Sequence, residues 1–365
     1  MTTGDQGAGA TLPPMVAAQH RAMPFTRLTD CGMDPADARR LLADTAAGIP
    51  WQDAAATIAD VQLERARSAE GAGHRATARQ AYRFASAALM FAQMAHQSDT
   101  ERKRELYARH TAATAALAPD VERVEIPHRD GVLGGWLCLP AGTPRATVIV
   151  WGGLSGWGAA YLPVADAYTA RGLACLLAEG PGQGESRLRQ GLYVDEHVTD
   201  GFARFVDLVE ADPRLGGGTG VQGVSFGGLF AAHLAAADPR VGAVVVNGAP
   251  AVPAVPEFRT AREQMAAVVG TDDLDRVAEI MDSLRFDPDK HRIGCPLLLL
   301  HGGHDPLARY EDQEPFLRAA DPATATLRIW PDGEHTLYNH AAERDALTAD
   351  WFTDHLINSP NTANG

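Results

Sequence analysis

The sequence predicts an α/β protein, with a mostly parallel β-sheet covered by helices on both faces and an all-helical domain before it. Three observations predict this fold. Residues 28–118 have helical periodicity and almost no β-branched runs. From Val121 onward, short apolar runs alternate with amphipathic stretches, which is typical of parallel strands joined by helices. Within that second part, the segment TGVQGVSFGGLFAA predicts a strand, a sharp turn at Ser225 and a helix.

The helical domain is expected to span residues 25–118. Asp34 followed by Pro35 predicts a helix start, because aspartate caps free N–H groups and proline suits the first helical position. Apolar periodicity predicts three longer helices, at 51–69, 74–96 and 100–117. Residues 1–24 are rich in Gly, Thr, Pro and Ala without periodicity, and we expect them to form a disordered arm.

The α/β core is expected to span residues 119–357, with a disordered tail over 358–365. VERVEI and GVLGGWLCL predict an opening antiparallel pair, and ATVIVW predicts the first fully buried strand. A helix is expected over 159–171. Residues 251–292 interrupt the alternation with two short helical segments, so we expect a lid over the strand ends there.

Composition narrows the class of function. The chain has 365 residues, 45% of them hydrophobic, and a formal net charge of −14, with no cluster of Lys and Arg. Nucleic-acid binding is therefore not expected, because it depends on basic groups that neutralise phosphates. The four cysteines show no metal-site or disulfide spacing. Neither a signal peptide nor a membrane-spanning run is present in the sequence, which favours a cytoplasmic protein.

Ser225 lies in a G-x-S-x-G motif between Gly223 and Gly227. A serine forced into a strained turn brings strand and helix so close that side chains at the two flanking positions would clash, so glycine is needed there. This is the pattern of a nucleophile elbow. The other interpretation is a tight turn with an inert serine.

A serine hydroxyl needs a base to take its proton and a carboxylate to orient that base. In this fold the acid follows a late strand and the histidine follows the last one, which points to Asp305 and His335. Asp305 could instead be a simple helix cap, since Asp-Pro occurs six times in the chain. Three other histidines compete with His335 and could be ordinary loop or helix residues: His301, His304 and His340. His301 and His304 together with Asp305 could also suggest metal ligands, but no second cluster completes such a site.

The negative oxygen that forms on the attacked carbonyl needs hydrogen-bond donors. We expect the backbone N–H of Phe226 to be one, at the start of the helix after Ser225, where the helix dipole adds positive potential. The second is expected from the turn at Gly153 and Leu154, although these residues could merely close a tight turn. Apolar candidates for the substrate pocket, each of which is more often core packing, are Trp157, Tyr161, Phe258, Met265 and Met281.

These motifs resemble a known group of enzymes. G-V-S-F-G-G at 223–228, H-G-G-H-D-P at 301–306 and G-E-H at 333–335 are similar to the α/β-hydrolase superfamily. The helical N-terminal domain, W-G-G-L at 151–154 and E-G-P-G-Q-G-E-S at 179–186 resemble the FrsA-like esterases and the 2,6-dihydroxypseudooxynicotine hydrolase branch.

The resemblance implies hydrolysis of an ester, or of a C–C bond next to a ketone, by Ser225, His335 and Asp305 in a cleft between helical domain and core. It also implies a homodimer. Several C–C hydrolases of that branch carry a carboxylate shortly after the Gly-Gly-Leu turn, where this chain has Ser155. Glu179 or Glu185 on the next loop could approach the same cleft.

The sequence therefore predicts a serine hydrolase that acts on a small to medium-sized, mainly apolar carbonyl compound. The reaction needs no cofactor and no metal, and its partner is the small-molecule substrate. Two other functions stay open at this stage. One is an acyl transferase or cyclase with the same triad, because exclusion of water depends on pocket shape. The other is a non-catalytic binding or regulatory protein on a hydrolase scaffold.

Overall fold

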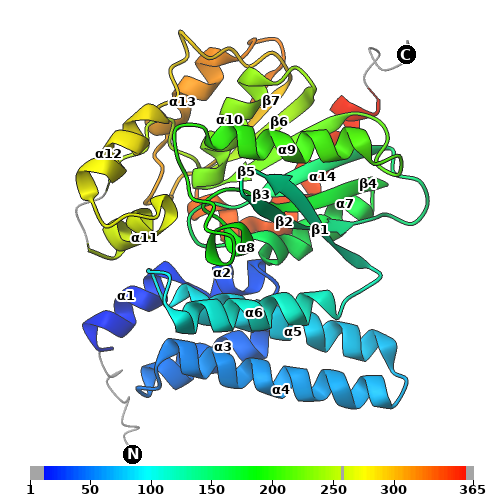
Figure 1. Cartoon of the computed structure of the whole chain (residues 1–365), viewed down its shortest axis with the longest axis vertical. Helices are drawn as coiled ribbons and strands as arrows, with labels where there is room; N and C mark the ends of the chain where they lie inside the picture. The colour runs from blue at the N-terminus through cyan, green and yellow to red at the C-terminus, as the bar shows by residue number, and fades with distance from the viewer. Residues whose placement is uncertain (1–11, 256–258, 359–365) are drawn as a thin grey trace, which may run out of the picture.

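A computed structural model of the chain describes residues 12–255 and 259–358. A layer of helices from the N-terminal third lies against the larger α/β part (Figure 1). The first residues of the predicted arm, the pocket candidate Phe258 and most of the predicted tail lie outside the described residues.

The N-terminal third is helical, as the sequence predicts. α3 begins at Pro35, and the Asp34 side chain accepts hydrogen bonds from the backbone N–H groups of Ala36 and Asp37. The long helices pack closely because their inner faces consist largely of alanine, and the Trp51 indole N–H donates to the carbonyl of Phe91 across that interface. The helices are α1 Pro14–Ala22, α2 Phe25–Asp30, α3 Pro35–Ala46, α4 Trp51–Gly71, α5 Arg75–Met94 and α6 Glu101–Ala115.

The expectation of a disordered arm over 1–24 is wrong for α1. Pro14 stands at its first turn, where a missing N–H costs nothing. The helix is attached by His20, whose Nε2 lies 2.8 Å from the Thr45 hydroxyl and whose ring meets the Trp51 ring edge-on. These contacts join residues far apart in the sequence, so local composition did not reveal them.

The α/β part contains one eight-stranded sheet in the order β1-β2-β4-β3-β5-β6-β7-β8. β1 and β2 pair antiparallel, β2 pairs antiparallel with β4, and the other neighbours are parallel. This confirms the predicted fold class and the opening antiparallel pair. The strands are β1 Val121–His128, β2 Gly131–Cys138, β3 Ala146–Trp151, β4 Leu173–Glu179, β5 Thr219–Val224, β6 Val241–Asn247, β7 Leu297–Gly302 and β8 Ala325–Trp330.

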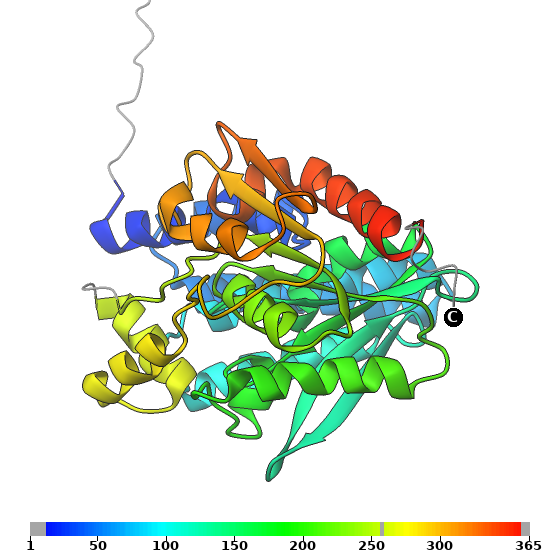
Figure 2. The same cartoon turned by 90° about the horizontal axis from the view of Figure 1, so that it is seen from above.

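Helices cover both faces of the sheet (Figure 2). α9 Val198–Ala211, α10 Phe226–Ala237 and α13 Tyr310–Ala319 pack in the larger apolar core on one face. α7 Leu162–Thr169 and α14 Ala341–Leu356 pack on the other. The helix expected over 159–171 is instead a 3₁₀ turn, Gly158–Tyr161, followed by the shorter α7.

Two helices, α11 Arg259–Val269 and α12 Leu274–Ser283, form the insertion between β6 and β7. They stand at one side of the α/β part, above α1 (Figure 1). Their inner faces join the larger apolar core through Met265, Val277 and Met281. The predicted helical insertion is therefore present, close to the helical layer.

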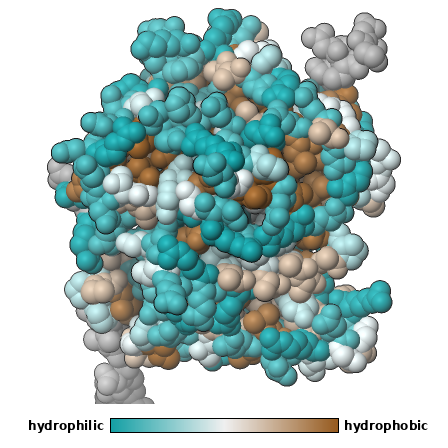
Figure 3. Space-filling model, viewed as in Figure 1, coloured by the Kyte–Doolittle hydropathy of each residue, from teal (hydrophilic) through white to brown (hydrophobic). Residues whose placement is uncertain are grey.

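The face shown in Figure 3 is mostly hydrophilic, with apolar side chains in separate small groups. Within the described residues, no helix is both long enough and apolar enough to cross a bilayer.

Buried polar contacts join the helical layer to the α/β part. Arg344 of α14 lies 2.7 Å from Asp30 of α2, and both side chains are more than nine-tenths buried. Arg187 of α8 (Gly184–Leu188) lies 3.0 Å from Asp99, which precedes α6. Removing one partner of such a pair strongly destabilises the fold, because the other charge is then buried without a partner.

Glu179, at the end of β4, is a third such contact. Its carboxyl accepts hydrogen bonds from the Tyr107 hydroxyl of α6 at 2.5 Å and from the backbone N–H of Glu185 at 2.7 Å. Burial raises the pKa of Glu179 to about 7, because the charged form loses water that two hydrogen bonds only partly replace.

This raised pKa makes the stability of the protein depend on pH. Between the ordinary pKa of 4.5 and about 7, the folded state keeps a proton on Glu179 that the unfolded state has lost, so stability falls as pH rises through that window. Glu179→Gln removes the group that binds this proton, so the variant lacks this contribution to the pH dependence of stability. We expect the loss of unfolding free energy between pH 5 and pH 8 to be smaller in the variant, by about 3 kcal/mol at most.

Urea unfolding of both proteins at the two pH values measures the effect. Glu125→Gln, on an exposed position of β1, is the matched control and should leave the pH profile unchanged. Equal profiles for wild type and Glu179→Gln would contradict the assignment.

Candidate active site

Ser225 stands at the sharp turn between β5 and α10. Its backbone has φ 56° and ψ −135°, which is unfavourable for a residue with a side chain. The turn is held by a hydrogen bond of 2.8 Å from the Ser225 N–H to the carbonyl of Asn247. A Cβ at Gly223 or Gly227 would lie 2.2 Å from a backbone oxygen, so only glycine fits beside the serine.

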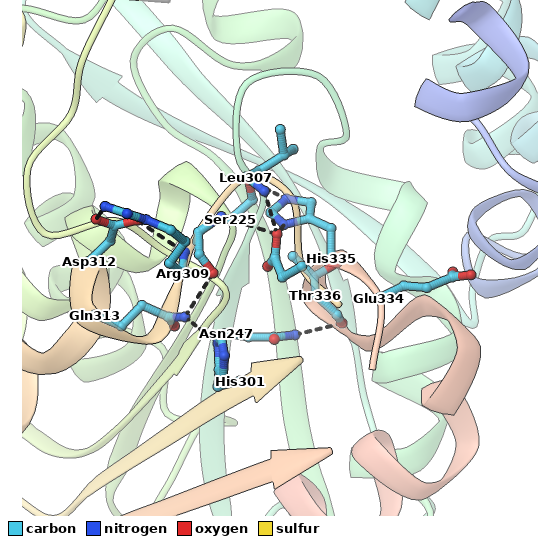
Figure 4. Close-up of polar contacts among 12 residues, drawn as sticks. Ser225, Asn247, His301, Leu307, Arg309, Asp312, Gln313, Glu334, His335 and Thr336 are labelled. Carbon is cyan, nitrogen blue, oxygen red and sulfur yellow. Dashed lines mark hydrogen bonds and ion pairs between the residues drawn. The ribbon is translucent and has the colours of Figure 1, made fainter. Parts of the chain in front are cut away.

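Ser225, His335 and Asp305 form one hydrogen-bonded chain. Figure 4 shows Ser225 beside His335. Nε2 of His335 lies 2.9 Å from the Ser225 hydroxyl oxygen, and Nδ1 lies 2.9 and 2.8 Å from the two carboxylate oxygens of Asp305. The Asp305 side chain is fully buried and also accepts backbone N–H groups of Leu307 and Ala308. In this arrangement the imidazole can take the serine proton while the carboxylate stabilises the resulting cation.

The loop that carries His335 is fixed from two sides. Thr336 and Leu337 have φ of 53° and 65°, so the chain turns abruptly after the histidine. The carbonyl of Thr336 accepts hydrogen bonds of 3.0 Å from both the Asn247 amide and the Arg344 guanidinium. Asn247 and Arg344 were not expected from the sequence, because an asparagine at a strand end and an arginine on a helix carry no local signal of this contact.

The predicted oxyanion turn lies directly beside the serine. A Cβ at Gly153 would stand 2.9 Å from Cβ of Ser225 and 3.0 Å from the backbone nitrogen of Phe226. The turn is held by two buried side chains: the Trp157 indole N–H donates to the carbonyl of Gly153 at 3.0 Å, and the Gln183 amide donates to that of Gly152 at 2.5 Å. These bonds hold Gly153 close to the first turn of α10.

A cavity of about 1190 Å³ opens in front of Ser225. Its wall combines α1 and α2 of the helical layer, the turn after β3, and the insertion around α11. Of the predicted pocket candidates, Ser155, Tyr161 and Met265 line this cavity, as does Leu154. A substrate in front of Ser225 would contact all three parts of the chain.

Three pocket candidates, Trp157, Glu179 and Met281, do not line this cavity. Trp157 is fully buried under the oxyanion turn, with its ring between Tyr107 and Arg187, and does not reach the cavity. Glu179 points to Tyr107 and is absent from the cavity wall that the described residues form. Glu185 pairs with Arg123 and Arg189 instead of approaching the site. Met281 is buried in the apolar core.

The competing histidines have separate surroundings. His301 is buried, and its Nδ1 lies 2.8 Å from the Gln313 amide (Figure 4). His340 contacts Asp332 at 3.0 Å. His304 lies on the cavity wall. Of the histidines weighed from the sequence, only His335 meets Ser225 and Asp305.

The helical layer contributes a charged side chain that the sequence analysis missed. Arg27 of α2 lines the cavity and donates to the Ser155 hydroxyl at 3.0 Å and to the carbonyl of Ala22 at 2.9 Å. Its guanidinium lies 5.5 Å from the centre of the Tyr338 ring. The neighbouring Thr26 hydroxyl donates to the Glu334 carboxylate at 2.5 Å. A short helix with one arginine looks like an ordinary surface helix in sequence, so these contacts could not be anticipated.

The chain is similar to several known proteins in sequence and fold. A family model described as serine aminopeptidase, S33, matches residues 142–274. The 2,6-dihydropseudooxynicotine hydrolase of Paenarthrobacter nicotinovorans is 27% identical over 322 residues, 85% of each chain. The crystal structure of 2,6-dihydroxy-pseudo-oxynicotine hydrolase aligns with a TM-score of 0.82 at 24% identity, covering 92% of this chain and 96% of that one. Wild-type AbyA5 aligns with a TM-score of 0.65 at 19% identity, covering 92% and 98%.

The tight approach of Gly153 to Ser225 generates a prediction. In Gly153→Ala the added Cβ meets Cβ of Ser225 at 2.9 Å, so we expect the labelling rate of Ser225 by a fluorophosphonate to fall about 10²–10³-fold, as when an oxyanion donor is lost. Gly156→Ala in the same loop is the matched comparison, because its Cβ would meet only side-chain atoms at ordinary contact distance, Met94 at 3.5 Å and Tyr161 at 3.8 Å, and should slow labelling far less. Equal labelling rates for the two variants would disprove the role of this approach.

Proposed function

We propose that this chain, an α/β-hydrolase of the branch that includes 2,6-dihydropseudooxynicotine hydrolase, is a serine hydrolase of small to medium-sized, mainly apolar carbonyl compounds. It cleaves an ester, or a C–C bond next to a ketone, through an acyl-enzyme. The observation that carries this proposal is the hydrogen-bonded chain of Ser225, His335 and Asp305, which faces a cavity of about 1190 Å³.

The proposed reaction uses only side chains and backbone groups of the protein. The Ser225 oxygen attacks the substrate carbonyl while Nε2 of His335 takes its proton, and Asp305 stabilises the imidazolium. The backbone N–H groups of Phe226 and of Gly153 or Leu154 receive the negative charge on the carbonyl oxygen. His335 then gives the proton to the leaving group, and water, activated by the same histidine, releases the acid from Ser225.

The site favours an ester over a C–C bond as the first substrate to test. An alcohol leaves readily once His335 protonates it, whereas a carbon leaving group must depart as a stabilised carbanion. Position 155 carries a serine bound to Arg27, where the resemblance places a carboxylate in several C–C hydrolases. Glu334 is a carboxylate on the cavity wall, but it accepts the hydroxyl of Thr26.

Removal of the nucleophile tests the proposal. We expect Ser225→Ala to lose covalent labelling by a fluorophosphonate and to lower kcat for p-nitrophenyl acetate by about 10⁴-fold or more, because no other group can form the acyl-enzyme. Intact-mass spectrometry and initial rates measure the two effects. Labelling that persists in Ser225→Ala would place the nucleophile elsewhere.

The role of the carboxylate has its own variant. Asp305→Asn keeps the shape of the side chain but presents an amide to His335, which favours the wrong tautomer, and we expect kcat to fall about 10⁴-fold. Asp332→Asn, next to His340 on the surface, is the matched control and should keep the wild-type rate. A full rate in Asp305→Asn would rule out the proposed triad.

The fate of the acyl group separates hydrolysis from acyl transfer. We expect the acid released in ¹⁸O-labelled water to contain one labelled oxygen, even when an added alcohol or amine competes. Both an aryl ester and a β-diketone should be supplied, because a ketone product from the diketone would establish C–C cleavage. Transfer of the acyl group to the added nucleophile without label would instead indicate an acyltransferase.

A further inference from the structure

We propose that Arg27 binds an anionic oxygen group of the substrate, so that the enzyme prefers carbonyl compounds that carry a carboxylate over their uncharged analogues. This inference rests on the proposed function and specifies the substrate class of the same site. Arg27 lies on α2, so the helical layer would take part directly in substrate selection.

The guanidinium brings a positive charge to the cavity, and no carboxylate is in contact with it among the described residues. Its acceptors are uncharged: the Ala22 carbonyl, the Ser155 hydroxyl and the Met94 sulfur. Among residues 12–255 and 259–358, no carboxylate oxygen lies within 4.0 Å of its nitrogens. Because arginine stays protonated at any physiological pH, this charge is permanent.

The nearby carboxylates already have other partners. Asp30, three residues along α2, pairs with Arg344 at 2.7 Å. On the cavity wall, Asp312 pairs with Arg309 at 3.0 Å, and Glu334 accepts the hydroxyl of Thr26. Nε of Arg27 is buried without an acceptor among the described residues, and the Tyr338 ring 5.5 Å away is only a weak substitute for an anion.

The charge stands close to the reacting centre. Nη2 of Arg27 contacts the Ser155 side chain at 3.0 Å, and Ser155 is two residues beyond Gly153, which touches Ser225. Two residues span at most about 7 Å, so one small molecule can reach both the serine and the guanidinium. A substrate carboxylate at Arg27 would thereby fix the orientation of the scissile carbonyl in front of Ser225.

A charge without a contacting counter-ion in a partly desolvated cavity raises the free energy of the unliganded enzyme, and a bound anion lowers that cost. A charge-assisted hydrogen bond in such a place changes affinity by about 10–100-fold.

Two matched ester pairs test the inference. One pair is mono-p-nitrophenyl glutarate and its methyl ester, with the carboxylate on the acyl side. The other is 4-acetoxybenzoate and its methyl ester, with the carboxylate on the leaving group. We expect the wild type to prefer the acid in at least one pair by about 10-fold or more in kcat/KM, and Arg27→Gln to lose that preference.

Two further variants complete the design. Arg27→Lys keeps the charge but not the planar fork, so it should retain part of the preference. Arg40→Gln removes an equivalent charge from the outer face of α3, where Arg40 pairs with Asp44, and should keep the wild-type preference. If Arg27→Gln slows acid and methyl ester equally, Arg27 only holds the loop at Ser155 and the inference is wrong. Absence of any preference in the wild type would also overturn it.

A binding measurement separates failure of this inference from failure of the proposed function. Glutarate should raise the melting temperature of the wild type more than glutaramide does, and Arg27→Gln should lose the difference. If neither the esters nor the β-diketone is cleaved but this difference holds, the anion site stands and the hydrolase chemistry proposed for Ser225 fails. If esters are hydrolysed without charge preference and glutarate does not bind, the anion site fails and the proposed function stands.

Discussion

The site depends on the close approach of three backbone segments around Ser225. The serine has φ 56°, and the segments before and after it touch, because a Cβ at Gly223 or Gly227 would lie 2.2 Å from a backbone oxygen. The oxygen opposite Gly227 belongs to Gly152, at the start of the turn that also carries Gly153. One set of glycine contacts therefore places the serine at the tip of β5 and brings the turn after β3 against it.

The strain at this turn is maintained by the elements around it. Asn247 accepts the Ser225 N–H through its backbone carbonyl and donates through its side chain to the carbonyl of Thr336, next to His335. The end of β6 thus positions both the serine and the histidine loop. Arg344 reaches the same Thr336 carbonyl and pairs with Asp30 of α2, which links the histidine loop to the helical layer. Tight coupling of this kind is what holds a strained backbone in one conformation.

The helical layer is part of the candidate site as well as a cover for it. α1 and α2 supply cavity wall, and Arg27 enters from α2 to contact Ser155 on the oxyanion turn. Below that turn, Trp157 packs between Tyr107 and Arg187, so the same interface supports the loop from behind. A change in the packing of the helical layer would therefore reach both the cavity wall and the turn at Gly153.

The sequence by itself determined the fold class and singled out Ser225, Asp305 and His335, because each of these leaves a local signal. Apolar runs mark strands, Asp34 with Pro35 marks a helix start, and glycines mark the turn at Ser225. Asp305 and His335 follow from strand ends, since parallel strands present them at one edge of the sheet. Only the tertiary structure decided that Glu179 and Trp157 face an internal interface, that α1 is ordered against Trp51, and that Arg27 reaches the cavity. These depend on contacts between residues distant in the chain, and the orientation of a side chain across such an interface is set by packing that periodicity does not encode.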